Sequence, residues 1–167
     1  MSRSTRRLFI LASLAGAVAL ASGARPANAD LSRKVITAFK GKILLTMGPL
    51  ESIGDDKATI AHFKKVTLTT IKGEQNGNDV QEWTFNYTAF LKSGGATRLK
   101  LEFYSDTGGY AADQTLTGVD PKMTVLEGDI TINEDDGLTK GKKYIVKLTG
   151  EVKGKDTVFA QTAVIMN

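Results

Sequence analysis

The sequence contains no cysteine and a single histidine among its 167 residues. A chain without thiols cannot form disulfides, thiolate zinc sites or iron–sulfur sites, and it has no cysteine nucleophile. A serine–histidine–acid triad would depend on His62, and no serine lies in a Gly-x-Ser-x-Gly motif. We therefore expect a protein that is not an enzyme, with His62 as an ordinary surface or edge residue.

Positive charge is concentrated at the N-terminus. The whole chain has 22 Lys and Arg against 18 Asp and Glu, a formal charge of +4. Residues 1–29 hold four of the arginines and no acid, so the remaining residues are formally neutral. They contain two arginines against 16 lysines, whereas phosphate and base recognition favours arginine. The positive formal charge of the whole chain therefore does not indicate a nucleic-acid partner.

The first 29 residues have the three regions of an export signal. A basic stretch precedes the apolar run 8–20, and Ala27-Asn28-Ala29 before Asp30 has the small-x-small form of a cleavage site. The run is shorter than the roughly 20 residues that span a bilayer. We expect residues 1–29 to form a cleavable signal helix, with cleavage between Ala29 and Asp30. Residues 30–167 would then form one domain in the periplasm or outside the cell, without a membrane anchor.

Residues 5–10 also resemble the twin-arginine signal, in which Ser or Thr is followed by two arginines, any residue, Phe and an aliphatic residue. Here the two arginines are Arg6 and Arg7, and the phenylalanine is Phe9. The resemblance implies a bacterial protein exported in its folded state. Leu11 stands where that signal usually has lysine. The general secretory route and the twin-arginine route both stay open.

Alternation of apolar and polar residues recurs throughout residues 30–167. Leu99, Leu101 and Phe103 share one parity, as do Trp83, Phe85, Tyr87, Ala89 and Leu91. This period of two is typical of half-buried strands. Glycine-rich and Asn-Gly or Asp-Gly turns separate the runs. The pattern predicts an all-β, antiparallel sandwich of about seven to nine strands, and leaves residues 55–63 as either a helix or an edge strand.

One segment resembles a known fold family. Five residues have the spacing Leu-x-x-Gly-x-x-Tyr-x-Val-x-Leu, namely Leu138, Gly141, Tyr144, Val146 and Leu148. This spacing resembles the signature of fibronectin type III and related immunoglobulin-like domains, in which the tyrosine hydroxyl bonds back across a corner. The resemblance implies an immunoglobulin-like sandwich whose last strands span 144–152 and 157–165, and it carries no function. Without a disulfide, Trp83 and its apolar neighbours would have to supply the core.

Acidic residues are densest between Asn133 and Gly137. Asn133, Asp135 and Asp136 are weak candidates for calcium ligands, because carboxylate and amide oxygens suit that ion. The segment lacks the alternating acids and final glutamate of an EF-hand loop. A solvated turn with Gly137 at a positive φ is the alternative interpretation.

Together these features predict an exported bacterial β-sandwich that binds a protein or cell-surface partner, or has a structural role, without a cofactor other than calcium. Self-assembly by edge-strand pairing is one form of this hypothesis, with segment 34–47 added to a neighbour's sheet. The alternatives are a carrier of a small apolar ligand, a calcium-dependent binding module, or a secreted hydrolase that uses acidic residues.

Overall fold

The computed structural model describes residues 25–26, 31–96 and 98–167. The strands are β1 (Arg25–Pro26), β2 (Ile43–Thr46), β3 (Thr70–Ile71), β4 (Glu74–Gln75), β5 (Gln81–Phe90), β6 (Leu99–Ser105), β7 (Tyr110–Leu116), β8 (Val125–Asn133), β9 (Lys142–Val152) and β10 (Lys155–Met166). The helices are α1 (Arg33–Phe39), α2 (Asp56–Val66) and the short 3-10 helix η1 (Glu134–Asp136). Arg6, Arg7, Ala29 and Asp30 of the expected signal lie outside the described residues.

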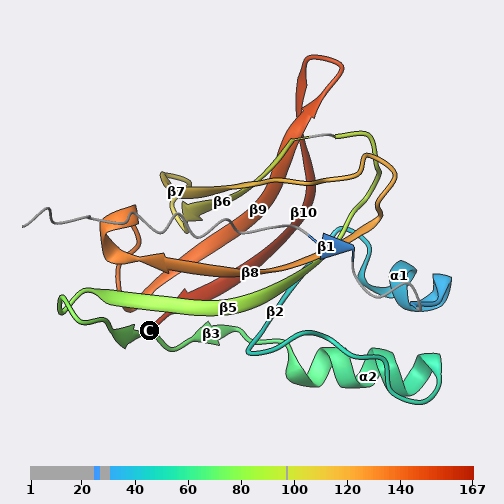
Figure 1. Ribbon diagram of the computed structural model, residues 1–167, viewed down its shortest axis with the longest axis horizontal. Coiled ribbons are helices and arrows are strands. Elements are labelled where there is room, and N and C mark those ends of the chain that lie inside the picture. Colours follow the sequence, from blue (N-terminus) through green and yellow to red (C-terminus); the bar gives the residue numbers. More distant parts are fainter. Residues whose placement is uncertain (1–24, 27–30, 97) are drawn as a thin grey trace, which may run out of the picture.

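The strands form two sheets, which confirms the β-sandwich in its coarse form (Figure 1). Sheet 1 has the order β1-β8-β5-β2, with β4 also paired to β5, and sheet 2 has the order β3-β10-β9-β6-β7. Neighbouring strands are antiparallel except for β3, which runs parallel to β10. Beyond the expected cleavage site there are nine described strands, β2 to β10, at the upper end of the expected range.

The core between the sheets is built from the alternating residues. The inward faces of β5, β6 and β9 meet there, with Trp83, Leu99, Phe103 and Val146 all completely buried. Phe159 of β10 is equally buried. Large side chains therefore fill the space between the sheets.

The structure corrects the all-β expectation at segment 34–47. Most of its first half is α1, which begins after Ser32, whose hydroxyl accepts a hydrogen bond from the backbone N–H of Val35. Val35 and Phe39, four residues apart, both turn to a buried face. The second half is β2, paired with β5. The segment thus belongs to the chain's own fold and is not a free strand.

Residues 55–63 are helical rather than an edge strand. The Asp55 side chain caps α2 by accepting a hydrogen bond from the backbone N–H of Ala58 at 2.8 Å. Both helices pack on the outer face of sheet 1 (Figure 1). This contact forms a second apolar cluster of Val35, Phe39, Leu44, Leu50, Phe63, Phe90 and Val125.

The residues of the immunoglobulin-like signature lie together at the start of β9. The Tyr144 hydroxyl accepts a hydrogen bond from the backbone N–H of Thr139 at 2.8 Å, across the corner that leads into the strand. Leu138 is buried in the core, and Gly141 has a φ of +78°, which glycine adopts without strain. A side-chain–backbone bond therefore fixes the entry into β9.

Candidate functional site

The calcium candidates form a self-contained turn. The Asn133 side chain accepts a hydrogen bond from the backbone N–H of Asp136, and the Asp136 carboxylate accepts one from the N–H of Asn133. Gly137 closes the turn with a φ of +109°. Two of the three candidate side chains are thus engaged in capping η1. Among the described residues, no group of three or more histidine or acidic side chains is placed to hold a metal ion.

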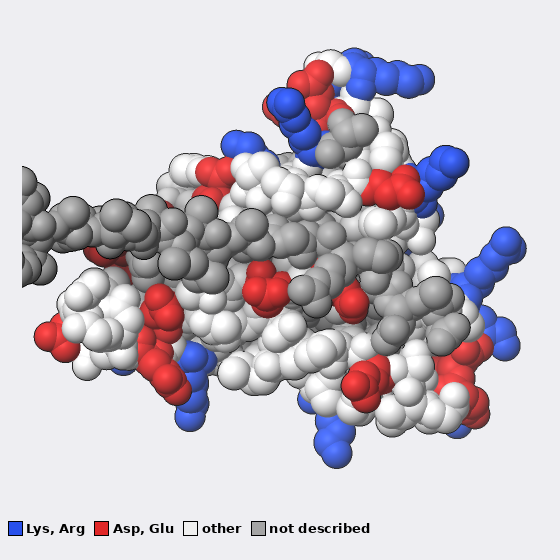
Figure 2. All heavy atoms as spheres, in the orientation of Figure 1, with Lys and Arg blue, Asp and Glu red and all other residues white. Residues whose placement is uncertain are grey.

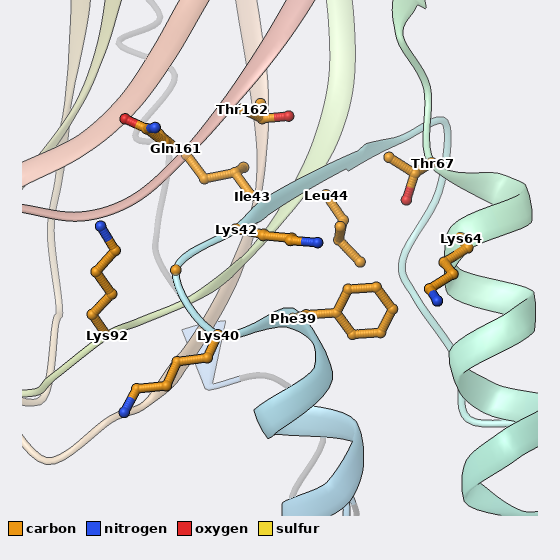
Figure 3. Close-up of a pocket in the computed structure, with 11 residues that line it drawn as sticks. Phe39, Lys40, Lys42, Ile43, Leu44, Lys64, Thr67, Lys92, Gln161 and Thr162 are labelled. Atoms are coloured by element: carbon orange, nitrogen blue, oxygen red, sulfur yellow. The ribbon is translucent and has the colours of Figure 1, made fainter.

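A different surface, which the sequence did not indicate, has a hollow. It has a volume of about 600 Å³ and lies where α1 and α2 both end, beside β2 and β10 (Figure 3). We call it the lysine hollow. Its lining residues are Phe39, Lys40, Gly41, Lys42, Ile43, Leu44, Lys64, Thr67, Lys92, Gln161 and Thr162.

Gly41 shapes one end of the lysine hollow. Its φ of +79° makes the turn between α1 and β2, and its N–H donates to the carbonyl oxygen of Phe90 at 2.6 Å. A Cβ at this position would lie 2.8 Å from Lys92 Cε. The aliphatic stem of Lys92 therefore lies directly across the glycine, and the positive φ of the turn favours a residue without a side chain.

The floor of the hollow is apolar and its rim is basic. Phe39 and Leu44 are buried beneath it, and Figure 3 shows Lys42 extending near both of them. Lys64 and Thr67 come from the end of α2, and Lys40 and Lys92 lie toward the opposite end.

The four rim lysines are unpaired in the described part of the chain, where the ion pair within 4 Å joins Lys100 to Asp113. Of the residues that the structure describes, no acidic one lines the hollow. Lys64 lies in the last turn of α2, where a cation offsets the negative end of the helix dipole. Lys42 and Lys92 lie outside both helices and have no such role. On the face in Figure 2, by contrast, acidic and basic side chains are interspersed.

A second hollow, of about 450 Å³, lies on the outer face of sheet 2 and has both signs of charge in its lining. Here Tyr104 donates to the Glu102 carboxylate at 3.0 Å, and Lys147 Nζ lies 4.2 Å from the centre of the Tyr104 ring. The hydrogen bond from Tyr110 to Asp113 raises the pKa of Tyr110 to about 12. The same bond, followed by the contact with Lys100, lowers the pKa of Asp113.

The other singled-out residues are not part of either hollow. Trp83 is completely buried, and its indole N–H donates to the carbonyl oxygen of Asn167 at 3.3 Å. His62 lies half-buried on α2 with its ring 6.2 Å from that of Phe63.

Comparison with known proteins identifies no relative: no family model, curated protein or solved structure gives a significant match. Among the described residues, the helices are all too short or too polar to cross a bilayer. Function must therefore be argued from the surfaces described above.

Proposed function

We propose that this protein is an exported, non-catalytic, immunoglobulin-like β-sandwich that binds an anionic ligand with an apolar body in the lysine hollow. The observation that carries this proposal is the set of four lysines that have no carboxylate partner among the described residues and that surround the apolar floor formed by Phe39 and Leu44. The fold, the ligand class and the export are each supported by separate features.

The strand order supports the immunoglobulin-like part of the proposal. In that fold one sheet contains strands A, B and E, and the other contains C, F and G. Here β2, β5 and β8 would be A, B and E, and β6, β9 and β10 would be C, F and G. The Tyr144–Thr139 hydrogen bond occupies the place of the tyrosine corner, before strand F.

The chemistry of the lysine hollow supports an amphipathic anion. Lysine ammonium groups attract carboxylate or phosphate without demanding one planar geometry. Phe39 and Leu44 form the floor of the hollow with only 2% and 5% of their surface exposed, so the apolar part of a ligand would rest largely on the aliphatic stems of the lysines. A neutral apolar ligand between the sheets is less well supported, because side chains such as Trp83 fill that space.

Calorimetric titration of the purified protein with decanoate tests this function. Decanoate combines a carboxylate with an apolar chain, and acetate and decanol each supply one half of it. We expect decanoate to bind at least about tenfold more tightly than either, with an affinity that falls as salt is added. The variant Lys42→Gln/Lys64→Gln should lose at least about tenfold in decanoate affinity.

The matched control is Lys153→Gln/Lys155→Gln, which removes the same charge from the tip of the β9–β10 hairpin, outside the hollow. This variant should bind decanoate as the unmodified protein does. Equal losses in the two double variants would mean that net charge alone attracts the anion, and no binding at millimolar decanoate would refute the proposed ligand class.

Export is tested separately from binding. N-terminal sequencing of the protein recovered outside the cytoplasm should begin at Asp30. If the twin-arginine route is used, Arg6→Lys/Arg7→Lys should leave unprocessed precursor in the cytoplasm. Processing and export that are unchanged in this variant would assign the general secretory route instead.

A further inference from the structure

A row of apolar side chains crosses the outer face of sheet 2. The strand registers place Tyr110 of β7 opposite Tyr104 of β6, Tyr104 opposite Ile145 of β9, and Ile145 opposite Ala163 of β10. Directly opposed residues on one face lie about 5 Å apart at Cβ, so these four side chains form one continuous strip. We call it the tyrosine strip.

The tyrosine strip faces outward. Each of three strip residues has a chain neighbour that is buried in the core: Phe103 beside Tyr104, Tyr144 beside Ile145, and Val164 beside Ala163. Alternate residues of a strand point to opposite faces, so the strip lies on the other side of the sheet. Tyr110 is 58% exposed, and Ala163 is exposed as well. The helices α1 and α2 pack on sheet 1 and so do not cover the strip, where Lys147 Nζ lies over the ring of Tyr104.

The two tyrosine rings are held in place before any partner arrives. They meet edge to face with their centres 5.9 Å apart. The Tyr110 hydroxyl donates a hydrogen bond to Asp113, and the Tyr104 hydroxyl donates one to Glu102. A side chain that is already ordered loses less conformational entropy on association. Rigid tyrosines of this kind are common anchors of protein interfaces.

A row of charged and polar residues runs beside the strip, one step along the strands. It consists of Asp113 on β7, Glu102 on β6, Lys147 on β9 and Gln161 on β10, in that order across the sheet. The acids thus lie on one half of the sheet and the base on the other half. An apolar centre with a polar border is the usual anatomy of a protein interaction surface.

We propose that a second copy of this chain binds the tyrosine strip, with sheet 2 of each copy packed face to face about a two-fold axis. An axis parallel to the strands and passing between β6 and β9 places β7 against β10 of the second copy and β6 against its β9. Sheets pack in this aligned way about 10 Å apart. A two-fold axis also requires a surface that is complementary to itself.

The surface meets that requirement in shape and in charge. Under this axis the large, exposed Tyr110 lies over the small Ala163 of the second copy, and Tyr104 lies over Ile145 of the second copy. In the neighbouring row, Glu102 faces Lys147 of the second copy, so opposite charges meet twice across the axis. A formally neutral domain adds no net repulsion between copies. These matches favour a second copy over a partner of one charge sign.

Sedimentation equilibrium of the purified protein over a range of concentrations tests the proposal. We expect a reversible monomer–dimer equilibrium. Ala163→Lys should raise the dimer dissociation constant by at least about tenfold, because a long charged side chain then meets Tyr110 of the second copy. Tyr110→Thr should have a similar effect by removing the anchor. Circular dichroism of both variants checks that the fold is retained.

The matched control is Met47→Lys, which removes a large apolar side chain that is 67% exposed at a position outside the strip. Its dissociation constant should equal that of the unmodified protein. Residues 1–29 are the same in every variant, so association caused by them would not depend on position 163. A protein that stays monomeric up to about 1 mM, or a dimer that Ala163→Lys and Tyr110→Thr leave unchanged, would overturn the proposal.

Discussion

The hydroxyl oxygen of Tyr144 lies 2.8 Å from the backbone nitrogen of Thr139, five residues earlier, and accepts its hydrogen bond. Tyr144→Phe leaves this partly buried N–H without its partner while keeping the aromatic packing. We expect the free energy of unfolding to fall by about 1–2 kcal/mol, measured by urea denaturation. The control is Tyr104→Phe, whose hydroxyl bonds to Glu102 on the solvent-facing side of sheet 2 and should contribute less than about 0.5 kcal/mol.

Gly128 lies on the core side of β8, directly beneath the ring of Tyr87. A Cβ at this position would come within 2.8 Å of the Tyr87 ring and hydroxyl. We expect Gly128→Ala to destabilise the protein by about 1–3 kcal/mol, because the ring has to shift within a packed core. Gly77→Ala, where no atom would lie within 4 Å of the new Cβ, should change stability by less than about 0.5 kcal/mol. Equal effects in the two variants would mean that the contact with Tyr87 is not the cause.

Phe63 anchors α2 in the second apolar cluster, with its ring centre 5.8 Å from that of Phe39. Phe63→Ala should cost about 3–5 kcal/mol of the packing that holds the helices on sheet 1. Hydrogen exchange should show faster amide exchange in α1 and α2, with smaller changes in β9 and β10. A uniform loss of protection would show that the helical layer and the sandwich open as one unit.

The hydrogen bond from Tyr110 to Asp113 predicts a pH dependence at both extremes. It raises the pKa of Tyr110 to about 12, so its stabilising effect is complete below the ordinary tyrosine value near 10 and is lost as the pH rises through about 12. It lowers the pKa of Asp113, so the effect is complete above the ordinary aspartate value and is lost as the pH falls through the lower folded value.

Absorbance at 295 nm during alkaline titration measures the tyrosine half of this prediction. Asp113→Asn removes the charged acceptor, so the pKa of Tyr110 should fall toward 10. Tyr110→Phe identifies which part of the absorbance change belongs to this residue. A Tyr110 transition near 10 in the unmodified protein would contradict the hydrogen bond.

The sheet-forming segments could be predicted from the sequence because alternation is a local signal. The last two strands were expected over 144–152 and 157–165, and the structure extends them to Lys142–Val152 and Lys155–Met166. The additional residues pair across the hairpin, from Lys142 with Met166 to Val152 with Lys155. Such end pairs depend on the partner strand, which a single segment does not reveal.

Helix α1 could not be predicted from local propensity. Its seven residues include Val35, Ile36 and Thr37, which are β-branched and suit strands as well. The burial of Val35 and Phe39 against α2 and sheet 1 favours the helix, and this contact is tertiary. The lysine hollow was missed for a related reason: Lys42, Lys64 and Lys92 are far apart in the sequence, and only the packing of the helices brings them together.

The lysine hollow has walls from both apolar clusters, since Phe39 and Leu44 belong to the cluster between the helices and sheet 1, whereas Ile43 belongs to the core between the sheets. A ligand seated there would touch residues of both clusters. Its binding free energy would therefore oppose detachment of the helices from the sandwich.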